Sequence, residues 1–394
     1  MLTRFTATGF RNLSALDVEL GRVNVFIGAN NCGKTNLFEA VDSLRQLVAQ
    51  GGPNGVDLGN SLSGLGGVHL PASGGDGTVR LGWSFASIEY EVELWLPGDP
   101  ARWHEWRVRK ERLDAGSWRY LAATNEEIGG APPGTGVVVR DGVATAVRPG
   151  LVHDRYTAGS SMGWRFPVGS SNLPELETAF SVLGGEAAGL AFASFPRHAG
   201  ARDQVGQRRE GDDRLSVRGD NLAHVLRELE QHPPFLDPVF ARLRHLVPDL
   251  VRLGTADAQG SVWANLTVGG SLRPLWTFSD GTVQALRLAM LLFRSRHRTV
   301  LLDEPELSLH PAWQREVANW LLDSEVQTLV ATHSPELLDA LTPAFVDGRA
   351  RLFVMEPRAV RRVDPRDFGE DLDAGWEFGD FYRQGFPALG GWPR

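Results

Sequence analysis

The chain has 394 residues, which is enough for two or three domains with a large buried core. Its net charge of −8 and pI near 5.7 argue against a globally basic nucleic-acid-binding protein. A single cysteine excludes a disulfide framework or a CxxC zinc site and indicates a reducing compartment. Since no apolar run approaches the roughly 18 residues of a membrane helix, we expect a cytoplasmic protein with no membrane partner.

The first 50 residues predict two strands, a glycine-rich loop and a helix. Strands are predicted over 2–10 and 15–27, and a helix over 35–49. The intervening segment 28–35, Gly-Ala-Asn-Asn-Cys-Gly-Lys-Thr, has the complete pattern of a phosphate-binding loop. Glycine lets several backbone N–H groups approach phosphates closely, and the helix N-terminus adds its positive end. This segment therefore predicts a nucleoside triphosphate ligand.

Two side chains of this loop have distinct expected roles. Lys34 neutralises β- and γ-phosphate oxygens, and Thr35 offers its hydroxyl to Mg²⁺. The sequence has 38 arginines but two lysines, Lys34 and Lys110, and the loop needs the compact point charge that the planar guanidinium lacks. The residues expected to line the nucleotide here are Gly28, Ala29, Asn30, Asn31, Cys32, Gly33, Lys34, Thr35 and Asn36.

The middle of the chain changes character twice. Residues 51–77 are rich in glycine, serine and proline and predict a loop region. Residues 78–147 alternate in short runs typical of strands, ending in two valine-rich runs joined by Asp141-Gly142, a strong hairpin signal. Residues 148–218 are less regular, with a helix expected over 173–183 and a charged, flexible stretch over 197–218.

Regular patterns return in the last third of the chain. Helices are predicted over 221–229 and 235–246, followed by strands over 251–255 and 262–268. A further helix begins near residue 280 and runs to about residue 296, and buried strands are predicted over 299–305 and 326–331.

The strand at 299–305 contains two adjacent carboxylates, Asp303 and Glu304. Strand ends gather at one edge of an open α/β sheet, so Asp303 is expected beside the phosphate loop, where it holds Mg²⁺ through water. Glu304 can orient and deprotonate the water that attacks the γ-phosphate. The alternative is a surface pair capping the next helix, which the apolar run 300–302 argues against.

His333 follows the strand at 326–331 and fits a γ-phosphate sensor, whereas the alternative is a helix cap with Ser334 as N-cap.

Ser279, Asp280 and Gly281 precede a helix and suggest another anion site, or alternatively an ordinary N-cap. One chain has no second phosphate to place there. We therefore expect a two-fold dimer in which this motif covers the γ-phosphate held by the partner's loop.

These motifs together resemble the ABC-type ATPase heads of RecF, SMC and overcoming-lysogenization-defect proteins. The chain is most similar to stand-alone prokaryotic AAA family ATPases of the AbiEii-like group. The motifs that carry the resemblance are 9–13 at the start, 28–36 (Walker A), 219–223, 279–282 (signature), 302–311 (Walker B and D-loop), 331–335 (H-loop) and 379–385.

The resemblance implies an α/β, ABC-type P-loop ATPase head with a β-rich N-terminal subdomain and an inserted lid region. It implies N-terminal head residues 1–100, an insertion over 101–215 and C-terminal head residues 216–394, and it adds Arg11 to the nucleotide-binding residues. Asp280 stands where transport ATPases carry glycine, which favours the defence and repair branch. The acidic run 364–373 is expected to be a solvated face.

Two functions remain open. The first is an ATP-gated homodimer, the sensor or motor of a prokaryotic defence system with a separate effector such as a nuclease or toxin. The second is a RecF-like repair ATPase that binds DNA directly. Two basic clusters support the second, because arginine and tryptophan side chains serve phosphates and stacked bases. They are Arg102, Arg107, Arg109, Lys110 and Arg112, interleaved with Trp103 and Trp106, and Arg197, Arg202, Arg208 and Arg209. Alternatively, Trp103 and Trp106 lie on a half-buried strand and pack into the core.

Overall fold

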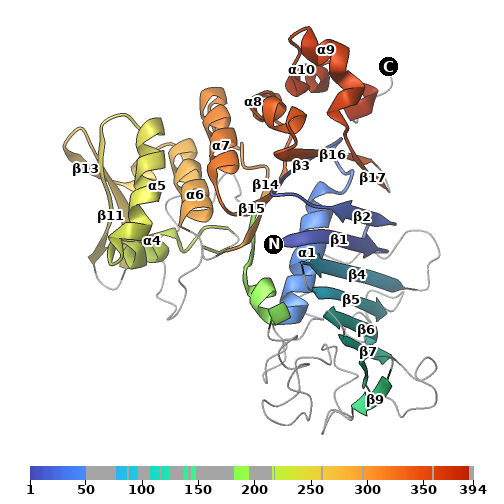
Figure 1. Ribbon diagram of the computed structural model, residues 1–394. Coiled ribbons are helices and arrows are strands. Elements are labelled where there is room, and N and C mark those ends of the chain that lie inside the picture. The colour runs from blue at the N-terminus through green and yellow to red at the C-terminus, as the bar shows by residue number, and fades with distance from the viewer. Residues whose placement is uncertain are drawn as a thin grey trace. The chain divides into compact units, whose positions relative to one another are not determined.

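The computed structural model divides the chain into two compact units, each made of segments distant in sequence (Figure 1). Unit 1 comprises Met1–Leu20, Asn30–Leu190 and Met355–Arg361, and unit 2 comprises Gly21–Ala29, Ala191–Val354 and Arg362–Arg394. The structure describes residues 1–49, 77–86, 88–95, 107–115, 118–123, 136–140, 143–147, 182–194, 215–216, 218–258, 261–294, 297–356 and 359–389.

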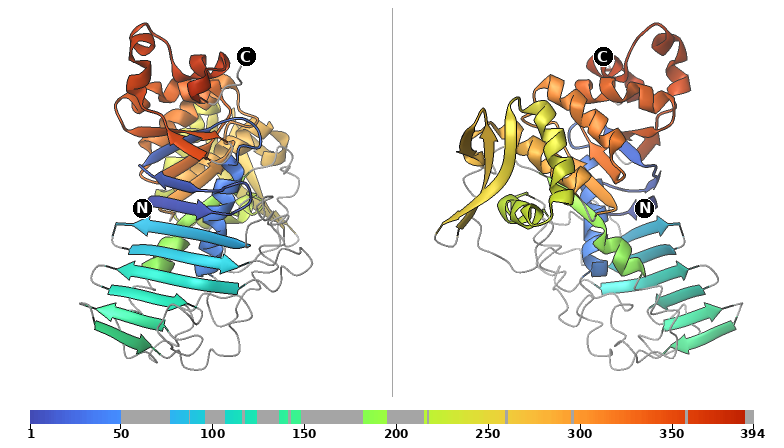
Figure 2. Two further views of the ribbon diagram at one scale, coloured as in Figure 1. Left: turned by 90° about the vertical axis from the view of Figure 1, so that its right-hand side faces the viewer. Right: turned by 60° about the vertical axis from the view of Figure 1, so that its left-hand side comes forward.

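Unit 1 is built on an antiparallel sheet, whose described strands follow the order β2-β1-β4-β5-β6-β7-β8-β9 (Figure 2). The helix α1 (Lys34–Ala49) packs against β1 and β4 through a stripe of buried apolar side chains. The strands are β1 (Leu2–Thr8), β2 (Leu16–Glu19), β4 (Thr78–Phe85), β5 (Ile88–Trp95), β6 (Arg107–Ala115), β7 (Trp118–Ala123), β8 (Gly136–Arg140) and β9 (Val143–Val147).

Unit 2 centres on a mixed sheet with the order β10-β14-β15-β3-β16-β17 among the described residues. Its β14, β15, β3 and β16 run parallel, and the interior strands are continuous apolar runs, as expected for strands covered on both faces. The strands are β3 (Val23–Ile27), β10 (Leu190–Ser194), β14 (Thr299–Asp303), β15 (Gln327–Ala331), β16 (Ala350–Glu356) and β17 (Ala359–Arg362).

The segment expected to form one strand over 15–27 forms two, β2 and β3, in different sheets. The break falls at the turn around Gly21, which the buried side chain of Asn24 holds. Its Oδ1 accepts from the Gly21 N–H at 2.7 Å, and its Nδ2 donates to the carbonyls of Gly21 (2.9 Å) and Thr328 (3.1 Å). A polar residue at 0% exposure inside an apolar run was the local signal for this break.

Helices and a small sheet complete unit 2. The predicted helices near 221–229, 235–246 and 280–296 and the strands near 251–255 and 262–268 are confirmed. A third strand, β13, and the helices of the C-terminal segment were missed. The α-helices and the small sheet of unit 2, confirmed and missed together, are α4 (Leu222–Glu230), α5 (Pro233–Leu246), β11 (Leu250–Ala258), β12 (Ser261–Val268), β13 (Ser271–Pro274), α6 (Asp280–Phe293), α7 (Pro311–Asp323), α8 (Pro335–Val346), α9 (Gly369–Asp373) and α10 (Phe378–Arg383).

Several predictions concern residues outside the described part of the chain. These are the glycine-rich loop 51–76, the turn Asp141-Gly142, most of the helix expected at 173–183, Trp103 and Trp106, and most of 197–218. The acidic residues of 364–373 are exposed, as predicted for a solvated face. Among the described helices, none combines the length and the apolar character that crossing a membrane requires.

The contact between α10 and α8 predicts a specific sensitivity at Gly379. A Cβ built on Gly379 would collide with Asp339 Oδ1 and the Pro335 carbonyl oxygen, both on α8. We expect Gly379→Ala to lower the free energy of unfolding by about 1–3 kcal/mol, as overpacking does. Gly369→Ala is the control, because its Cβ would meet nothing within 4 Å, and we expect a change within about 0.5 kcal/mol. Equal stabilities of the two variants in urea unfolding would contradict this packing.

Candidate functional site

The loop between β3 and α1 has the backbone that a phosphate cradle requires. Gly28 and Gly33 have φ values of 146° and 111°, a region that L side chains rarely adopt. A Cβ on Gly33 would lie 2.8 Å from Asn12 Oδ1 and 3.1 Å from Leu13 Cδ2. Glycine is thus needed at Gly33 both for its conformation and for the close approach of a neighbouring segment.

That neighbouring segment, residues 9–13, braces the loop within unit 1. Asn12 donates from Nδ2 to the Asn31 carbonyl at 2.9 Å, and its Oδ1 accepts from Asn36 Nδ2 at 2.7 Å. Arg11 donates to Asn36 Oδ1 at 2.9 Å and forms an ion pair with Glu39. Arg11 was expected to bind the nucleotide, and the structure directs its guanidinium to these two residues of α1. Asn12 had no separate role in the sequence-based prediction.

Lys34 and the start of α1 provide the positive charge at this loop. Lys34 is 7% exposed, and its Nζ lies 3.6 Å from the Sγ of the buried Cys32. The first turn of α1 contains no acidic residue, so the positive helix end is not offset locally, and Thr35 is exposed there. The loop glycines, the lysine and the helix end therefore fit the phosphates of a nucleotide.

In unit 2, the parallel strands bring the predicted carboxylates to one edge of the sheet. Asp303 is in register with Ala331 of β15, and Ala331 is in register with Phe26 of β3, so these three strands end together. Gly28, the first loop residue, follows β3 at that edge. This arrangement is the one from which a strand-end carboxylate can reach a ligand.

Glu304 adopts a left-handed backbone, with φ of 46°, directly after β14. Its N–H donates to the Ala331 carbonyl at 2.8 Å, which joins this turn to the end of β15. The Glu304 Oε1 lies 3.9 Å from His333 Nε2, and both side chains are partly exposed. A non-glycine residue in this region costs about 1–3 kcal/mol, and such costs cluster at functional sites.

A second carboxylate, Glu306, supports the segment that carries His333. Its Oε1 accepts from the His333 backbone N–H at 2.8 Å, while its Oε2 is buried without a hydrogen-bond partner among the described residues. Burial raises the pKa of the Glu306 carboxyl, and the nearby charge of Glu304 adds to this effect although hydrogen bonds oppose it. The sequence-based prediction missed Glu306, since its role depends on a contact 27 residues away.

The His333 ring is also held from the C-terminal segment. Its Nδ1 lies 3.0 Å from the hydroxyl of Tyr382 on α10. Ser334, next in the chain, caps α8 by accepting from the Leu337 N–H at 3.0 Å. Ser334 is therefore the N-cap of α8, as the alternative prediction had it. The His333 ring takes no part in this cap and lies beside Glu304.

The predicted signature motif stands at the N-terminus of α6. The Ser279 side chain accepts from the Thr282 N–H at 3.3 Å and so caps the helix, while Ser279 and Asp280 are both exposed. A Cβ on Gly281 would lie 2.6 Å from the carbonyl oxygen of Ser308, which follows the Walker B segment. The motif is thus an N-cap, it is open to solvent, and it requires glycine at Gly281.

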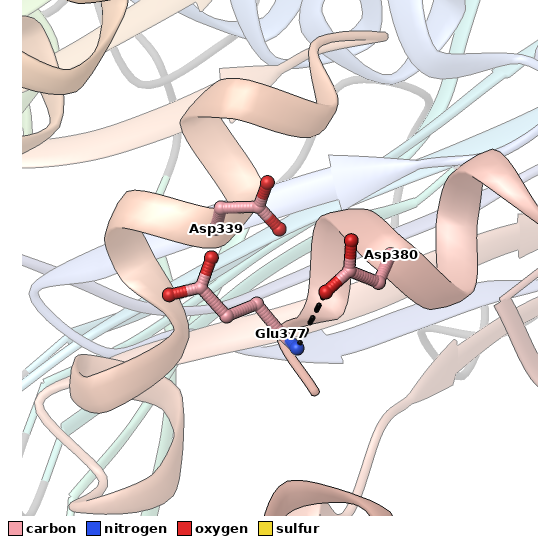
Figure 3. A group of neighbouring side chains, drawn as sticks. All are labelled: Asp339, Glu377 and Asp380. Atoms are coloured by element: carbon pink, nitrogen blue, oxygen red, sulfur yellow. Dashed lines mark hydrogen bonds between the residues drawn. The ribbon is translucent and has the colours of Figure 1, made fainter. Parts of the chain in front are cut away.

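A further acidic group, Asp339, Glu377 and Asp380, lies between α8 and the start of α10 (Figure 3). Its carboxylate oxygens approach one another within 4.8 Å, and burial, together with repulsion from Asp339 and Asp380, raises the pKa of the Glu377 carboxyl. Arg383 donates to Asp339 at 2.8 Å and to Asp380 at 3.0 Å. Since a guanidinium offsets their charge, these side chains act as an ionic contact between the two helices.

The loop on a strand–helix connection and the carboxylates at the parallel strand ends define a P-loop ATPase head of the ABC type. A family model described as "AAA domain, putative AbiEii toxin, Type IV TA system" matches residues 23–126 and 184–339, more than half of the chain. The chain belongs to this family, and it is an ATPase.

Two curated relatives are similar to a short part of the chain, and several solved structures align with most of it. A stretch of 41 residues is 56% identical to the DNA replication and repair protein RecF of two Lactobacillus delbrueckii subsp. bulgaricus strains, covering 10% of this chain and 11% of RecF. The chain spans about a tenth of the length of these relatives.

Solved structures of SMC heads align at 12% identity. A SmcHead bound to the C-winged helix domain of ScpA covers 92% of this chain and 97% of its own, with a TM-score of 0.46. The SMC head domain from Thermotoga maritima covers 92% and 98%, with a TM-score of 0.41. An Smc head with an extended coiled coil, bound to the C-terminal domain of ScpA derived from Pyrococcus furiosus, covers 95% and 98%, with a TM-score of 0.42.

The raised pKa of Glu306 predicts how stability depends on pH. Between the ordinary value of 4.5 and the raised native pKa, the folded protein retains a proton that the unfolded chain releases, so stability falls as pH rises. Glu306→Gln keeps an acceptor for the His333 N–H and abolishes this fall. The variant should therefore gain stability relative to the wild type above pH 4.5, by at most about 1.4 kcal/mol per pH unit, until the difference levels off.

Urea unfolding without nucleotide at about pH 4, 6 and 8 measures this difference. Glu325→Gln, at an exposed position of the same unit, controls for the loss of one negative charge. A stability difference between Glu306→Gln and the wild type that stays constant across this range would contradict the burial of a titrating carboxyl at Glu306.

Proposed function

We propose that this ATPase is Mg²⁺-dependent, binds ATP between two copies of the chain, and acts as the sensor or motor of a prokaryotic defence system with a separate effector. The observation that carries the hydrolytic part is the meeting of Asp303, Glu304 and His333 at the strand edge where the phosphate loop begins. Each proposed role follows from the position of the residue.

The phosphate loop and α1 bind the triphosphate in this proposal. Backbone N–H groups of 28–36 and the Lys34 ammonium face the phosphate oxygens, and the segment 9–13 keeps the loop in shape. Thr35 and Asp303 would hold Mg²⁺, which supplies charge neutralisation at the phosphates. Arg11 contributes through its contacts with Asn36 and Glu39 of α1.

Glu304 is the proposed general base and His333 the proposed γ-phosphate sensor. Glu304 is 40% exposed, so its carboxylate is accessible to a water molecule. Its left-handed backbone is held by the hydrogen bond from its N–H to the Ala331 carbonyl of β15. His333 presents Nε2 on the same side as the Glu304 carboxylate. A base and a hydrogen-bond donor side by side can orient the attacking water and bind the phosphate that leaves.

The exposed signature motif supports the proposed dimer. Ser279 and Asp280 face solvent at the positive end of α6, and Gly281 packs against the segment that follows the Walker B carboxylates. An ATP bound to the partner's loop would place its γ-phosphate at this motif. ATP would then favour the closed dimer through its higher affinity for that state, and hydrolysis would reset it.

The family supports the proposed biological role. Its description names a putative toxin of a type IV TA system, which supports a toxin-type system as the setting of this ATPase. In the proposal, opening and closing of the ATPase dimer is passed to a nuclease or toxin encoded separately.

Replacing the proposed general base should trap the dimer. Glu304→Gln should lower kcat for ATP hydrolysis by about 10²–10⁴-fold while ATP binding persists. In the presence of ATP and Mg²⁺ this variant should elute from a size-exclusion column as a dimer, and without nucleotide as the apo protein does. Elution of the ATP-bound variant at the apo position would rule out the shared-nucleotide dimer.

A double variant provides the matched control. Ser279→Arg adds a bulky side chain at an exposed cap position, and it should leave ATP binding to the loop intact. In the Glu304→Gln background it should abolish the ATP-dependent dimer. If the double variant still dimerises with ATP, the signature motif does not form the interface.

The second candidate is a RecF-like ATPase that binds DNA directly, and the 41-residue similarity to RecF favours it. Of the arginines that first suggested it, Arg112 is paired with Asp114 in the described part of β6, so that side chain is already engaged. Of the other cluster members, Arg107, Arg109 and Lys110 lie on β6, where the backbone alone is described, and Arg102, Arg197, Arg202, Arg208 and Arg209 lie outside the described residues.

Fluorescence anisotropy with a labelled DNA duplex at increasing salt separates the two candidates. Direct DNA binding through several phosphate contacts should weaken about 10³-fold or more between 50 and 200 mM salt. The defence sensor with a protein effector predicts no such specific, steeply salt-dependent binding. A steep slope that requires ATP would favour the RecF-like function.

A further inference from the structure

We propose that Tyr382 is a positioning residue for His333, and that its hydroxyl holds the imidazole in the form that donates a hydrogen bond from Nε2. This inference rests on the proposed role of His333 as the γ-phosphate sensor and names a residue that the role depends on. It starts from the 3.0 Å contact between the Tyr382 hydroxyl and His333 Nδ1.

The chemistry of the sensor requires a particular tautomer. A phosphate oxygen only accepts hydrogen bonds, so the ring nitrogen facing it must carry a hydrogen. Nε2 is the nitrogen on the Glu304 side, at 3.9 Å from that carboxylate. When the Tyr382 hydroxyl donates to Nδ1, a neutral imidazole carries its hydrogen on Nε2. The same contact restrains rotation of the ring.

Two further contacts of His333 bear on this choice. Glu306 holds the backbone N–H of His333 and leaves the ring free to select either tautomer. Glu304 faces Nε2 at a distance longer than a hydrogen bond. Because a carboxylate only accepts, Glu304 favours a hydrogen on the Nε2 that faces it, and we assign the matching choice at Nδ1 to the Tyr382 hydroxyl acting as donor.

Tyr382 is itself held rigidly by its neighbours on α10. Phe378 and Phe381 are fully buried, and the Phe378 N–H donates to Thr342 Oγ1 of α8 at 2.9 Å. Arg383 donates to Asp339 at 2.8 Å and to Glu336 at 3.2 Å, both on α8. The acidic group of Figure 3 therefore docks α10 on the helix that begins two residues after His333. These contacts fix the position of α10, so the Tyr382 hydroxyl is already in place to donate to His333 Nδ1.

The test is Tyr382→Phe, which removes the hydroxyl and keeps the ring. We expect kcat for ATP hydrolysis to fall about threefold to tenfold, the size of one neutral hydrogen bond, with KM for ATP unchanged within about twofold. The ¹⁵N NMR spectrum of histidine-labelled protein reports the tautomer. The His333 signals, assigned by their loss in His333→Ala, should show a hydrogen on Nε2 in the wild type and a mixture in Tyr382→Phe.

Tyr90→Phe is the matched control, since it removes a hydroxyl from a buried tyrosine of β5 in the other unit. It should leave kcat and the His333 tautomer unchanged, whatever it does to thermal stability. A purely structural role of Tyr382 would change the unfolding temperature without changing the tautomer, and that result would overturn the inference.

His333→Ala separates the two levels of the proposal. If His333→Ala loses activity while Tyr382→Phe keeps the wild-type kcat and tautomer, the positioning role of Tyr382 is wrong and the sensor role of His333 stands. If His333→Ala hydrolyses ATP at the wild-type rate, the sensor role is wrong and the inference falls with it.

Discussion

The register of three parallel strands is the constraint on which the candidate site depends. Asp303, Ala331 and Phe26 are aligned across β14, β15 and β3, so the segments that follow these strands all leave the sheet at one edge. Those segments carry the predicted Walker B carboxylates, the predicted H-loop histidine and the first glycine of the predicted phosphate loop. A shift of one strand by a single residue would turn its side chains to the opposite face and separate these groups.

At that edge, hydrogen bonds hold the segments that follow β14 and β15 in place. The Glu304 N–H is bound to the end of β15, and the His333 N–H is bound to a buried carboxylate, Glu306. Such arrangements cost free energy, through a left-handed backbone and a desolvated acid, and they persist because the surrounding sheet is well packed. The cost is consistent with a site selected for geometry over local stability.

The C-terminal segment, distant in sequence, also contributes a polar contact to this edge of the sheet. Phe378 of α10 packs edge-on against Phe345 of α8, and ion pairs of Arg383 with Glu336 and Asp339 also attach α10 to α8, which places Tyr382 at the His333 ring. The proposed hydrolytic centre is therefore assembled from three chain regions of unit 2, and the last of them includes the motif 379–385.

The sequence alone determined the ATPase class and most elements, because those depend on local patterns. The loop 28–35, the apolar run before Asp303 and the periodicity of α6 are each readable within a few residues. Only the tertiary structure decided the bond from Asn24 to Thr328, the bracing by Asn12 and the contacts of Glu306 and Tyr382 with His333. Each of these joins residues that folding brings together from separate segments, and a hydrogen bond between distant positions leaves no periodic trace in one sequence.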